Sequence, residues 1–357
     1  MQVLSILCIL GSALIPFVHA GFDPTSSSNI AVYWGQNSFN QAKGSLAQQR
    51  LAYYCSNTDI DIIPLAFMNG ITPAITNFAN AGDNCTSFSD NSNLLDCPQI
   101  ADDIEICQKT YGKTILLSLG GSAYTQGGWS STTDAQNAAQ TVWDMFGPTG
   151  AEVDRPFGDA VIDGFDFDFE STATNLPAFG AELRSLMNAA TDKKYYLSAA
   201  PQCPFPDSAD GSTLDAIAFD LVMVQFYNNW CETTNFVVGA TTQSIFNFDE
   251  WDTWAKSSLN PDVKVFLGIP ASSSAAGSGY TNGSQLQAAI SYSKQYSSFG
   301  GIMIWDMSQL YAPVGASATE TLVGQWDQCG GTGYTGSTQC QSPYTCVETT
   351  QWWSSCK

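Results

Sequence analysis

The chain has 357 residues, of which 44% are hydrophobic and 13% are charged; this composition excludes a disordered chain and fits one large folded domain or two ordinary ones. Its 33 Asp and Glu against 12 Lys and Arg give a formal net charge of −21, and a surface this acidic repels nucleic acid and anionic lipid headgroups. The single histidine, His19, lies in a segment that we expect to be removed, which excludes histidine-dependent triads and zinc sites.

The first 20 residues have the pattern of a secretory signal peptide. An apolar stretch over residues 2–18 ends in the small-x-small sequence Val18-His19-Ala20, and polar residues follow. We predict cleavage after Ala20 and a secreted protein, although no Lys or Arg precedes the apolar run. The alternative is a membrane anchor, which Pro16 and the shortness of the run disfavour.

Short apolar or β-branched runs recur through the first 305 residues, separated by segments with helical periodicity. In one such segment apolar residues from Phe179 to Ala190 recur at helical spacing, with Pro177 near the start. Alternating strands and helices predict an α/β fold, and eight strands favour a (β/α)8 TIM barrel over a doubly wound sheet. The eight predicted strands are 30–34, 62–67, 114–119, 164–169, 196–199, 221–226, 264–268 and 301–305.

The alternating pattern ends after Asp306, where small and polar residues follow. We therefore predict four units: the signal peptide at 1–20, the (β/α)8 domain with the candidate catalytic site at 21–311, a linker at 312–324 and a small module at 325–357. A flexible linker of this length reaches roughly 20 Å on average, which would keep the module close to the barrel.

Cysteine usage supports this division. Eleven cysteines become ten when Cys8 leaves with the leader, and an even count in a secreted chain indicates up to five disulfides. Four of them lie in the last 29 residues, a density typical of a small disulfide-stapled β module that has too little core to fold unaided. A metal held by four thiolates is the alternative, but no C-x-x-C pair is present. Sequons at Asn84 and Asn282 agree with secretion and leave open whether either is glycosylated.

The stretch DGFDFDFE, residues 163–170, is the most informative part of the sequence. Side chains alternate along a strand, so Asp166, Asp168 and Glu170 share one face and three phenylalanines share the other. In a barrel the acids would line the interior, and the phenylalanines would pack outward under the helices. Adjacent carboxylates in a confined site cannot all ionise, so we expect at least one raised pKa.

Glu170 comes last in this row, at the carboxyl end of the strand, where barrel enzymes keep their chemistry. Without histidine, a carboxyl with a raised pKa is the group best suited to act as a general acid. One alternative is a divalent-cation site, for which we see no converging carbonyl ligands. The other is an exposed acidic face, which the three alternating phenylalanines disfavour.

The acidic row carries a resemblance. Asp163, Asp166, Asp168 and Glu170 match the D-x-x-D-x-D-x-E signature of family 18 glycoside hydrolases, and the barrel resembles the class III, hevamine-type chitinases of plants and fungi over about residues 29–310. Further segments that carry the resemblance are YWGQN at 33–37, SLGG at 118–121, AAPQCP at 199–204, QFYNN at 225–229 and Trp305.

The resemblance implies a retaining mechanism in which the N-acetyl group of the substrate is the nucleophile. Glu170 would protonate the glycosidic oxygen and later act as base on water. Asp168 would orient the acetamido N–H, and Asp166 would share a proton with it. Tyr227 would donate its hydroxyl to the acetamido carbonyl oxygen. No cofactor and no metal are implied.

The resemblance also implies the substrate-binding residues and the disulfides of the barrel. Trp305 would form the floor of the −1 sugar site, and Tyr33, Gln225 and Asn228 would lie in the same pocket, whereas Asp163 would be structural. The alternative is a purely structural role, in which Tyr227 and Trp305 are aromatic residues of the core. The implied disulfides are Cys55 with Cys107, Cys85 with Cys97, and Cys203 with Cys231.

Residues 325–357 resemble a fungal family 1 carbohydrate-binding module, the cellulose-binding type. Its three tryptophans, Trp326, Trp352 and Trp353, would form a flat face that stacks on polysaccharide. A domain this small has little interior, which makes a surface platform more plausible than burial. The resemblance pairs Cys329 with Cys346 and Cys340 with Cys356. Crystalline chitin and cellulose present similar flat surfaces, so the preferred polymer stays open.

Together these observations predict a secreted, monomeric endochitinase that acts on chitin, binds chitin and cellulose surfaces, and has no nucleic-acid or membrane partner. Two alternatives stay open: a catalytically inactive lectin or enzyme inhibitor on the same barrel, and an endo-β-N-acetylglucosaminidase that acts on N-glycans. A cellulase is disfavoured because glucose lacks the acetamido group. The sequence leaves endo versus exo action, processivity and the biological role open.

Overall fold

The computed structural model describes residues 21–41, 43–44, 46–148, 150–312, 325–326, 328–331, 340, 344–350 and 353–357. The predicted signal peptide, all of the predicted linker after residue 312, and Trp352 lie outside these residues.

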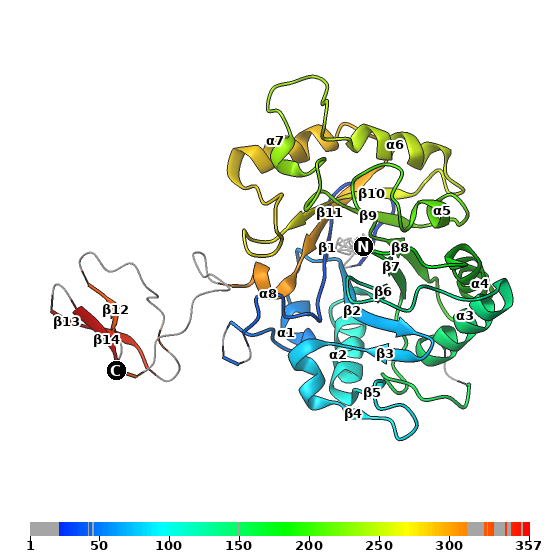
Figure 1. Ribbon diagram of the computed structural model, residues 1–357, viewed down its shortest axis with the longest axis horizontal. Coiled ribbons are helices and arrows are strands. Elements are labelled where there is room, and N and C mark those ends of the chain that lie inside the picture. Colours follow the sequence, from blue (N-terminus) through cyan, green and yellow to red (C-terminus); the bar gives the residue numbers. More distant parts are fainter. Residues whose placement is uncertain are drawn as a thin grey trace, which may run out of the picture.

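Eight parallel strands close into a barrel, and helices cover its outside (Figure 1). Closure is made by β1, which pairs with β11 on one side and with β2 on the other. This confirms the predicted TIM barrel. The barrel strands are β1 (Asn29–Val32), β2 (Ile62–Ile71), β6 (Thr114–Gly120), β7 (Gly164–Asp168), β8 (Tyr196–Ala199), β9 (Leu221–Gln225), β10 (Lys264–Pro270) and β11 (Phe299–Trp305).

The observed strand ends differ from the predicted ones by a few residues. The largest difference is in β2, which runs on to Ile71 because it turns into an antiparallel pair with β3 (Ala74–Thr76). A separate two-stranded sheet joins β4 (Thr86–Ser87) to β5 (Leu95–Asp96).

One helix start was predicted from the sequence. The predicted helical segment forms α4, which starts at Leu176 with Pro177 in its first turn, where the missing N–H of proline costs nothing. The helices are α1 (Leu51–Cys55), α2 (Pro98–Lys109), α3 (Thr132–Phe146), α4 (Leu176–Ala189), α5 (Gly211–Leu214), α6 (Phe248–Ser257), α7 (Gly283–Ser293) and α8 (Met307–Leu310), with 3₁₀ helices η1 (Ala79–Asn84) and η2 (Thr233–Asn235).

The phenylalanines of β7 pack outward into the core between the barrel and its helices. Phe165 lies near Trp143 of α3, and the ring of Phe167 lies 5.8 Å from that of Phe179 in α4. Phe169, just past the strand, is also buried in this core. The alternation along β7 therefore sends the aromatic side chains to the helices and leaves the other face for the interior.

The amino end of the barrel is closed by Phe22, the second residue after the predicted cleavage site. Its side chain is 5% exposed and packs edge-on against Tyr196, 5.1 Å between ring centroids, and near Phe266. Its N–H donates to the Thr114 hydroxyl at 2.9 Å. With this end filled, a ligand has to enter from the carboxyl end.

Three disulfides brace the loops of the barrel domain, and they join the same pairs that the resemblance implied. Two lie around α1 and α2, and the third ties the loop after β8 to the loop after β9. The pairs are Cys55–Cys107, Cys85–Cys97 and Cys203–Cys231.

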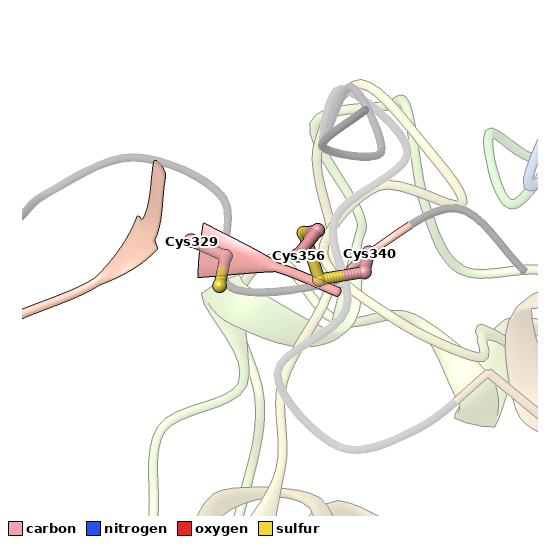
Figure 2. A group of neighbouring side chains, drawn as sticks. All are labelled: Cys329, Cys340 and Cys356. Atoms are coloured by element: carbon pink, nitrogen blue, oxygen red, sulfur yellow. A yellow bond between two sulfur atoms is a disulfide. The ribbon is translucent and has the colours of Figure 1, made fainter. Parts of the chain in front are cut away.

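The tail module contains a three-stranded antiparallel sheet in the order β12 (Gln328–Gly330), β14 (Trp353–Cys356), β13 (Cys346–Thr350). Disulfides join Cys329 to Cys346 and Cys340 to Cys356, and Figure 2 shows the second of these with Cys329 nearby. In the part of the chain that the structure describes, Cys329, Cys340 and Cys356 are the one group of three potential metal ligands that converge. Because all three sulfurs are in disulfides, they offer no thiolate to a metal.

Candidate active site

The acidic row of β7 faces the interior of the barrel. Asp166 and Asp168 are 0% and 3% exposed. Glu170, two residues past the carboxyl end of the strand, is exposed. The row thus runs from the core to an opening at the end of the barrel where TIM-barrel enzymes act.

Asp166 is held by three hydroxyl groups from three different strands or strand ends. One oxygen accepts from the Tyr33 hydroxyl at 2.6 Å and the Ser118 hydroxyl at 2.7 Å, and the other accepts from Ser198 at 2.6 Å. Ser118 and Ser198 lie directly opposite Asp166 in the barrel register, on β6 and β8. Burial raises the pKa of Asp166, and the three hydroxyls counteract that rise.

Asp168 has fewer stabilising partners. Among the described residues, one side chain donates a hydrogen bond to it, the Gln225 amide at 2.9 Å, and the same amide donates to the Ala200 carbonyl. Burial first, and then the negative charges of Glu170 and Asp166, raise the pKa of Asp168 well above its usual value. A proton held by this row is therefore stabilised more on Asp168 than on Asp166.

Glu170 is the exposed member, yet the wall of the pocket removes water from part of its carboxyl. This desolvation raises the pKa of Glu170. A carboxyl that keeps its proton toward neutral pH while facing an open pocket can donate that proton to a bound molecule.

A cavity of about 310 Å³ opens above these acids. Both Asp168 and Glu170 line it, together with four of the residues expected from the resemblance or the motifs around it: Gln225, Tyr227, Asn228 and Trp305. The remaining lining residues are Gln36, Phe67, Ser122, Gln202, Asn229 and Ala275.

Aromatic groups shape the cavity. Trp305 ends β11, and its ring lies 5.5 Å from Tyr33 and 5.9 Å from Phe67, with the Phe67 plane nearly parallel. Tyr227 is 6% exposed, and burial followed by the charges of Asp168 and Glu170 raises its pKa well above the ordinary value. Its phenol therefore stays neutral and keeps a proton to donate, and among the described residues its hydroxyl has no hydrogen-bond partner.

Not every expected residue contacts the cavity. Tyr33 lies beneath it, 1% exposed, and bonds Asp166. Asn228 lines the cavity, but its side-chain oxygen accepts from the backbone N–H groups of Gly277 and Ser278. Asp163 lies just before β7, outside the cavity, and pairs with Lys193 at 2.7 Å.

Sequence reasoning missed several residues of the site. Gln202 and Asn229 bond each other at 2.9 Å across the cavity wall, and both fall inside motifs that were recognised without being given a role. Ser118 also lies in a motif of the resemblance, SLGG at 118–121, whereas Ser198 lies only in a predicted strand, and neither hydroxyl was assigned a role. Phe67 lies within β2 and Ser122 follows β6, but no local pattern marks either as a site residue.

In the tail module, Trp326 and Trp353 are 63% and 45% exposed. These two side chains are available at the surface of the module, as a stacking platform requires. The third predicted member, Trp352, lies outside the described residues.

A closed (β/α)8 barrel with a row of carboxylic acids that opens at its carboxyl end is an architecture of glycoside hydrolases. Residues 29–282 match the family described as Glycosyl hydrolases family 18, and residues 325–353 match the Fungal cellulose binding domain. The chain therefore belongs to glycosyl hydrolases family 18.

Two fungal proteins are similar over most of their length. Endochitinase 33 of Trichoderma harzianum is 58% identical over 305 residues, which is 85% of this chain and 94% of that protein. Class III chitinase of Arthroderma benhamiae is 46% identical over 304 residues, 82% of this chain and 84% of that protein.

Solved structures share the barrel. ICChI chitinase from Ipomoea carnea is 30% identical with a TM-score of 0.62, covering 80% of this chain and 96% of that one. A xylanase and α-amylase inhibitor protein from Scadoxus multiflorus is 29% identical with a TM-score of 0.61, covering 80% of this chain and 95% of that one. Among the described residues, every helix is too short or too polar to cross a bilayer.

Proposed function

We propose that the protein is a secreted endochitinase that hydrolyses β-1,4 bonds between N-acetylglucosamine units with retention of configuration. The observation that carries the proposal is the row Asp166, Asp168, Glu170, buried at one end and open at the other, in a cavity shared with Tyr227 and Trp305. The 58% identity to a protein named Endochitinase 33 supports chitin as the substrate.

In this proposal Glu170 is the general acid and then the general base. A raised pKa favours the protonated carboxyl that this step requires, and the proton passes to the glycosidic oxygen as the bond to the leaving sugar breaks. The carboxylate that results accepts a proton from the water that completes hydrolysis. Because the acid form is required, activity should fall as the pH rises through the pKa of Glu170.

The N-acetyl group of the sugar acts as the nucleophile, as is characteristic of the family to which the chain belongs. Asp168 accepts a hydrogen bond from the acetamido N–H and stabilises the positive charge that develops there. Its own proton moves toward Asp166, whose three hydroxyl partners can turn to fit either protonation state.

Tyr227 and Trp305 complete the sugar site. The neutral Tyr227 phenol donates to the acetamido carbonyl oxygen as that oxygen attacks the anomeric carbon, which stabilises the developing charge. Trp305 provides the flat surface under the −1 sugar, and Gln225 fixes the side chain of Asp168.

Two finer parts of the proposal concern location. The leader at 1–20 would direct secretion, and the exposed tryptophans of the tail module would hold the enzyme on insoluble chitin or cellulose by stacking. The resulting high local concentration of substrate would favour cleavage of insoluble polymer over soluble oligomers.

A second candidate is an inhibitor or lectin on the same barrel, and the similarity to the inhibitor from Scadoxus multiflorus supports considering it. The exposed Glu170, and the Tyr227 hydroxyl that has no hydrogen-bond partner in the described part of the chain, favour the enzyme.

The deciding experiment is incubation of the purified protein with a chitin hexasaccharide, with product lengths and anomers followed by NMR at early times. Internal cleavage with fresh β-anomers is the expected result. Fresh α-anomers would refute retention, and a bound but uncut hexasaccharide would favour the lectin or inhibitor.

A further inference from the structure

We infer that the loop between β10 and α7, residues 271–282, positions the Tyr227 phenol, and that Gly279 and Asn228 are positioning residues for the reaction. This inference rests on the proposed function, because it takes Tyr227 as the donor to the acetamido group. It concerns how this chain orients the phenol, because no hydrogen bond within the described residues holds the Tyr227 hydroxyl.

Gly279 brings the loop backbone directly against Tyr227. A Cβ at Gly279 would lie 2.6 Å from the Tyr227 Cα and 2.7 Å from its Cβ, distances that force one backbone to move. The residue also has φ +94°, a conformation that favours glycine. The close approach leaves the start of the Tyr227 side chain no room to shift toward the loop.

Asn228, the next residue after Tyr227, holds the loop by hydrogen bonds. Its side-chain oxygen accepts from the N–H groups of Gly277 at 2.8 Å and Ser278 at 3.1 Å, and its own N–H donates to the Ser278 carbonyl at 3.3 Å. Its φ of 58° is one that asparagine tolerates better than most residues. The Asn228 oxygen is therefore committed to the loop and is not free for the substrate.

Thr233 adds a buried anchor. Its hydroxyl donates to the Gly279 carbonyl at 2.5 Å, and its N–H donates to the carbonyl of Phe226, the residue before Tyr227. Thr233 is 0% exposed and does not line the cavity. The loop is thus tied to both flanks of Tyr227, while the phenol has no hydrogen-bond partner among the described residues.

If only packing around the Cα and Cβ of Tyr227 orients the phenol, a change in that packing will move the hydroxyl. A misplacement of about 1 Å can lower the rate about 100-fold. The test is a double-mutant cycle between Gly279→Ala and Tyr227→Phe, measured as kcat and KM on chitin hexasaccharide. We expect Gly279→Ala to lower kcat about 10- to 100-fold in the parent. We expect it to cost less than about threefold in the Tyr227→Phe background, because the aimed hydroxyl is already gone.

The matched control is Gly239→Ala. Gly239 has a similar φ of +83°, but no atom lies within 4 Å of the position of its Cβ. This variant carries the same backbone strain without contact with Tyr227, and we expect kcat to stay within about twofold of the parent. Equal losses of kcat from Gly279→Ala in both backgrounds would overturn the inference, because a general loss of structure lowers kcat whether or not the Tyr227 hydroxyl is present.

Thr233→Val is a milder second variant that keeps the volume and removes the anchor to Gly279. It should show a smaller kcat loss that also vanishes in the Tyr227→Phe background.

An NMR measurement decides the inference even if the hexasaccharide is not cleaved, which would refute the proposed function instead. In ¹³C-tyrosine-labelled protein, the Tyr227 signal is assigned by its loss in Tyr227→Phe. It should shift in Gly279→Ala and Thr233→Val and stay in place in Gly239→Ala. An unmoved Tyr227 signal in the first two variants would overturn the inference.

Discussion

Two acids at opposite ends of β7 have opposite surroundings. Asp163, at the amino end, accepts from Lys193 at 2.7 Å, from the Ile115 N–H at 2.9 Å and from Gln108 at 2.8 Å. Asp168, at the carboxyl end, has the Gln225 amide and no cationic partner among the described residues. At one end of the strand an aspartate is paired with a cation, and at the other end an aspartate has no such pair among the described residues and has a raised pKa.

The contrast extends to the two ends of the barrel. At the amino end, Arg184 pairs with Asp220 at 2.8 Å, and Phe22 fills the interior. None of the ion pairs within the described ranges includes a residue that lines the candidate active site. An acid with partners adds stability, whereas an acid without them is kept for chemistry at a cost in stability.

The largest expected effect is at the unpaired end. Glu170→Gln removes the proton donor and keeps the shape, so we expect kcat on chitin hexasaccharide to fall at least about 1000-fold, within the range of general acid catalysis. Binding of the hexasaccharide, measured by calorimetry, should stay within about threefold. Substantial remaining turnover would show that another group is the acid.

The matched substitution at the paired end is Asp163→Ala. It leaves Lys193 and the Ile115 N–H without their partner, so we expect the free energy of unfolding to fall by about 2 kcal/mol. Urea denaturation measures this loss, and kcat should change less than about twofold. A large kcat loss in a folded variant would contradict the assignment of the amino end to stability and of the carboxyl end to catalysis.

The pH dependence of stability tests the buried acids together. The pKa values of Asp166, Asp168, Asp210 and Asp306 are raised by burial, so the folded state holds protons that the unfolded chain has released above about pH 4. That contribution is full below the unfolded pKa and is lost as the pH rises through the folded pKa values. The lowered pKa values of Asp134 and Asp252 act in the opposite direction.

We therefore expect the free energy of unfolding to be about 1 to 2 kcal/mol higher at pH 5 than at pH 7. Urea denaturation at both values measures it. Asp168→Asn should flatten the slope, because it removes one group that must ionise in the interior. Greater stability at pH 7 than at pH 5 would contradict the assignment of raised pKa values to this row.

The smallest effect is expected in the tail module. Trp353→Ala should weaken adsorption to insoluble chitin by about 1 kcal/mol, or about fivefold, and leave hexasaccharide cleavage unchanged. Val347→Ala is the control, since Val347 is exposed on the neighbouring strand of the same module. If the two variants adsorb equally well, Trp353 is not part of the platform.

Much of the fold and part of the site follow from local sequence patterns. The eight barrel strands were predictable because apolar runs and helical spacing are properties of neighbouring residues. The inward row of acids on β7 was predictable because side chains alternate along any strand. Asn228 shows the limit: its motif indicated the cavity, but its oxygen turned out to hold a loop about 50 residues away in sequence.

The sequence by itself determined which side chains share a face of β7, where the strands lie and how densely the last cysteines are spaced. Only the tertiary structure decided that Ser118 and Ser198 flank Asp166, that Lys193 reaches Asp163, and that Gly279 presses on Tyr227. The reason is physical. Alternation and periodicity depend on bond geometry over a few residues, whereas register and contact depend on how distant segments pack around one core.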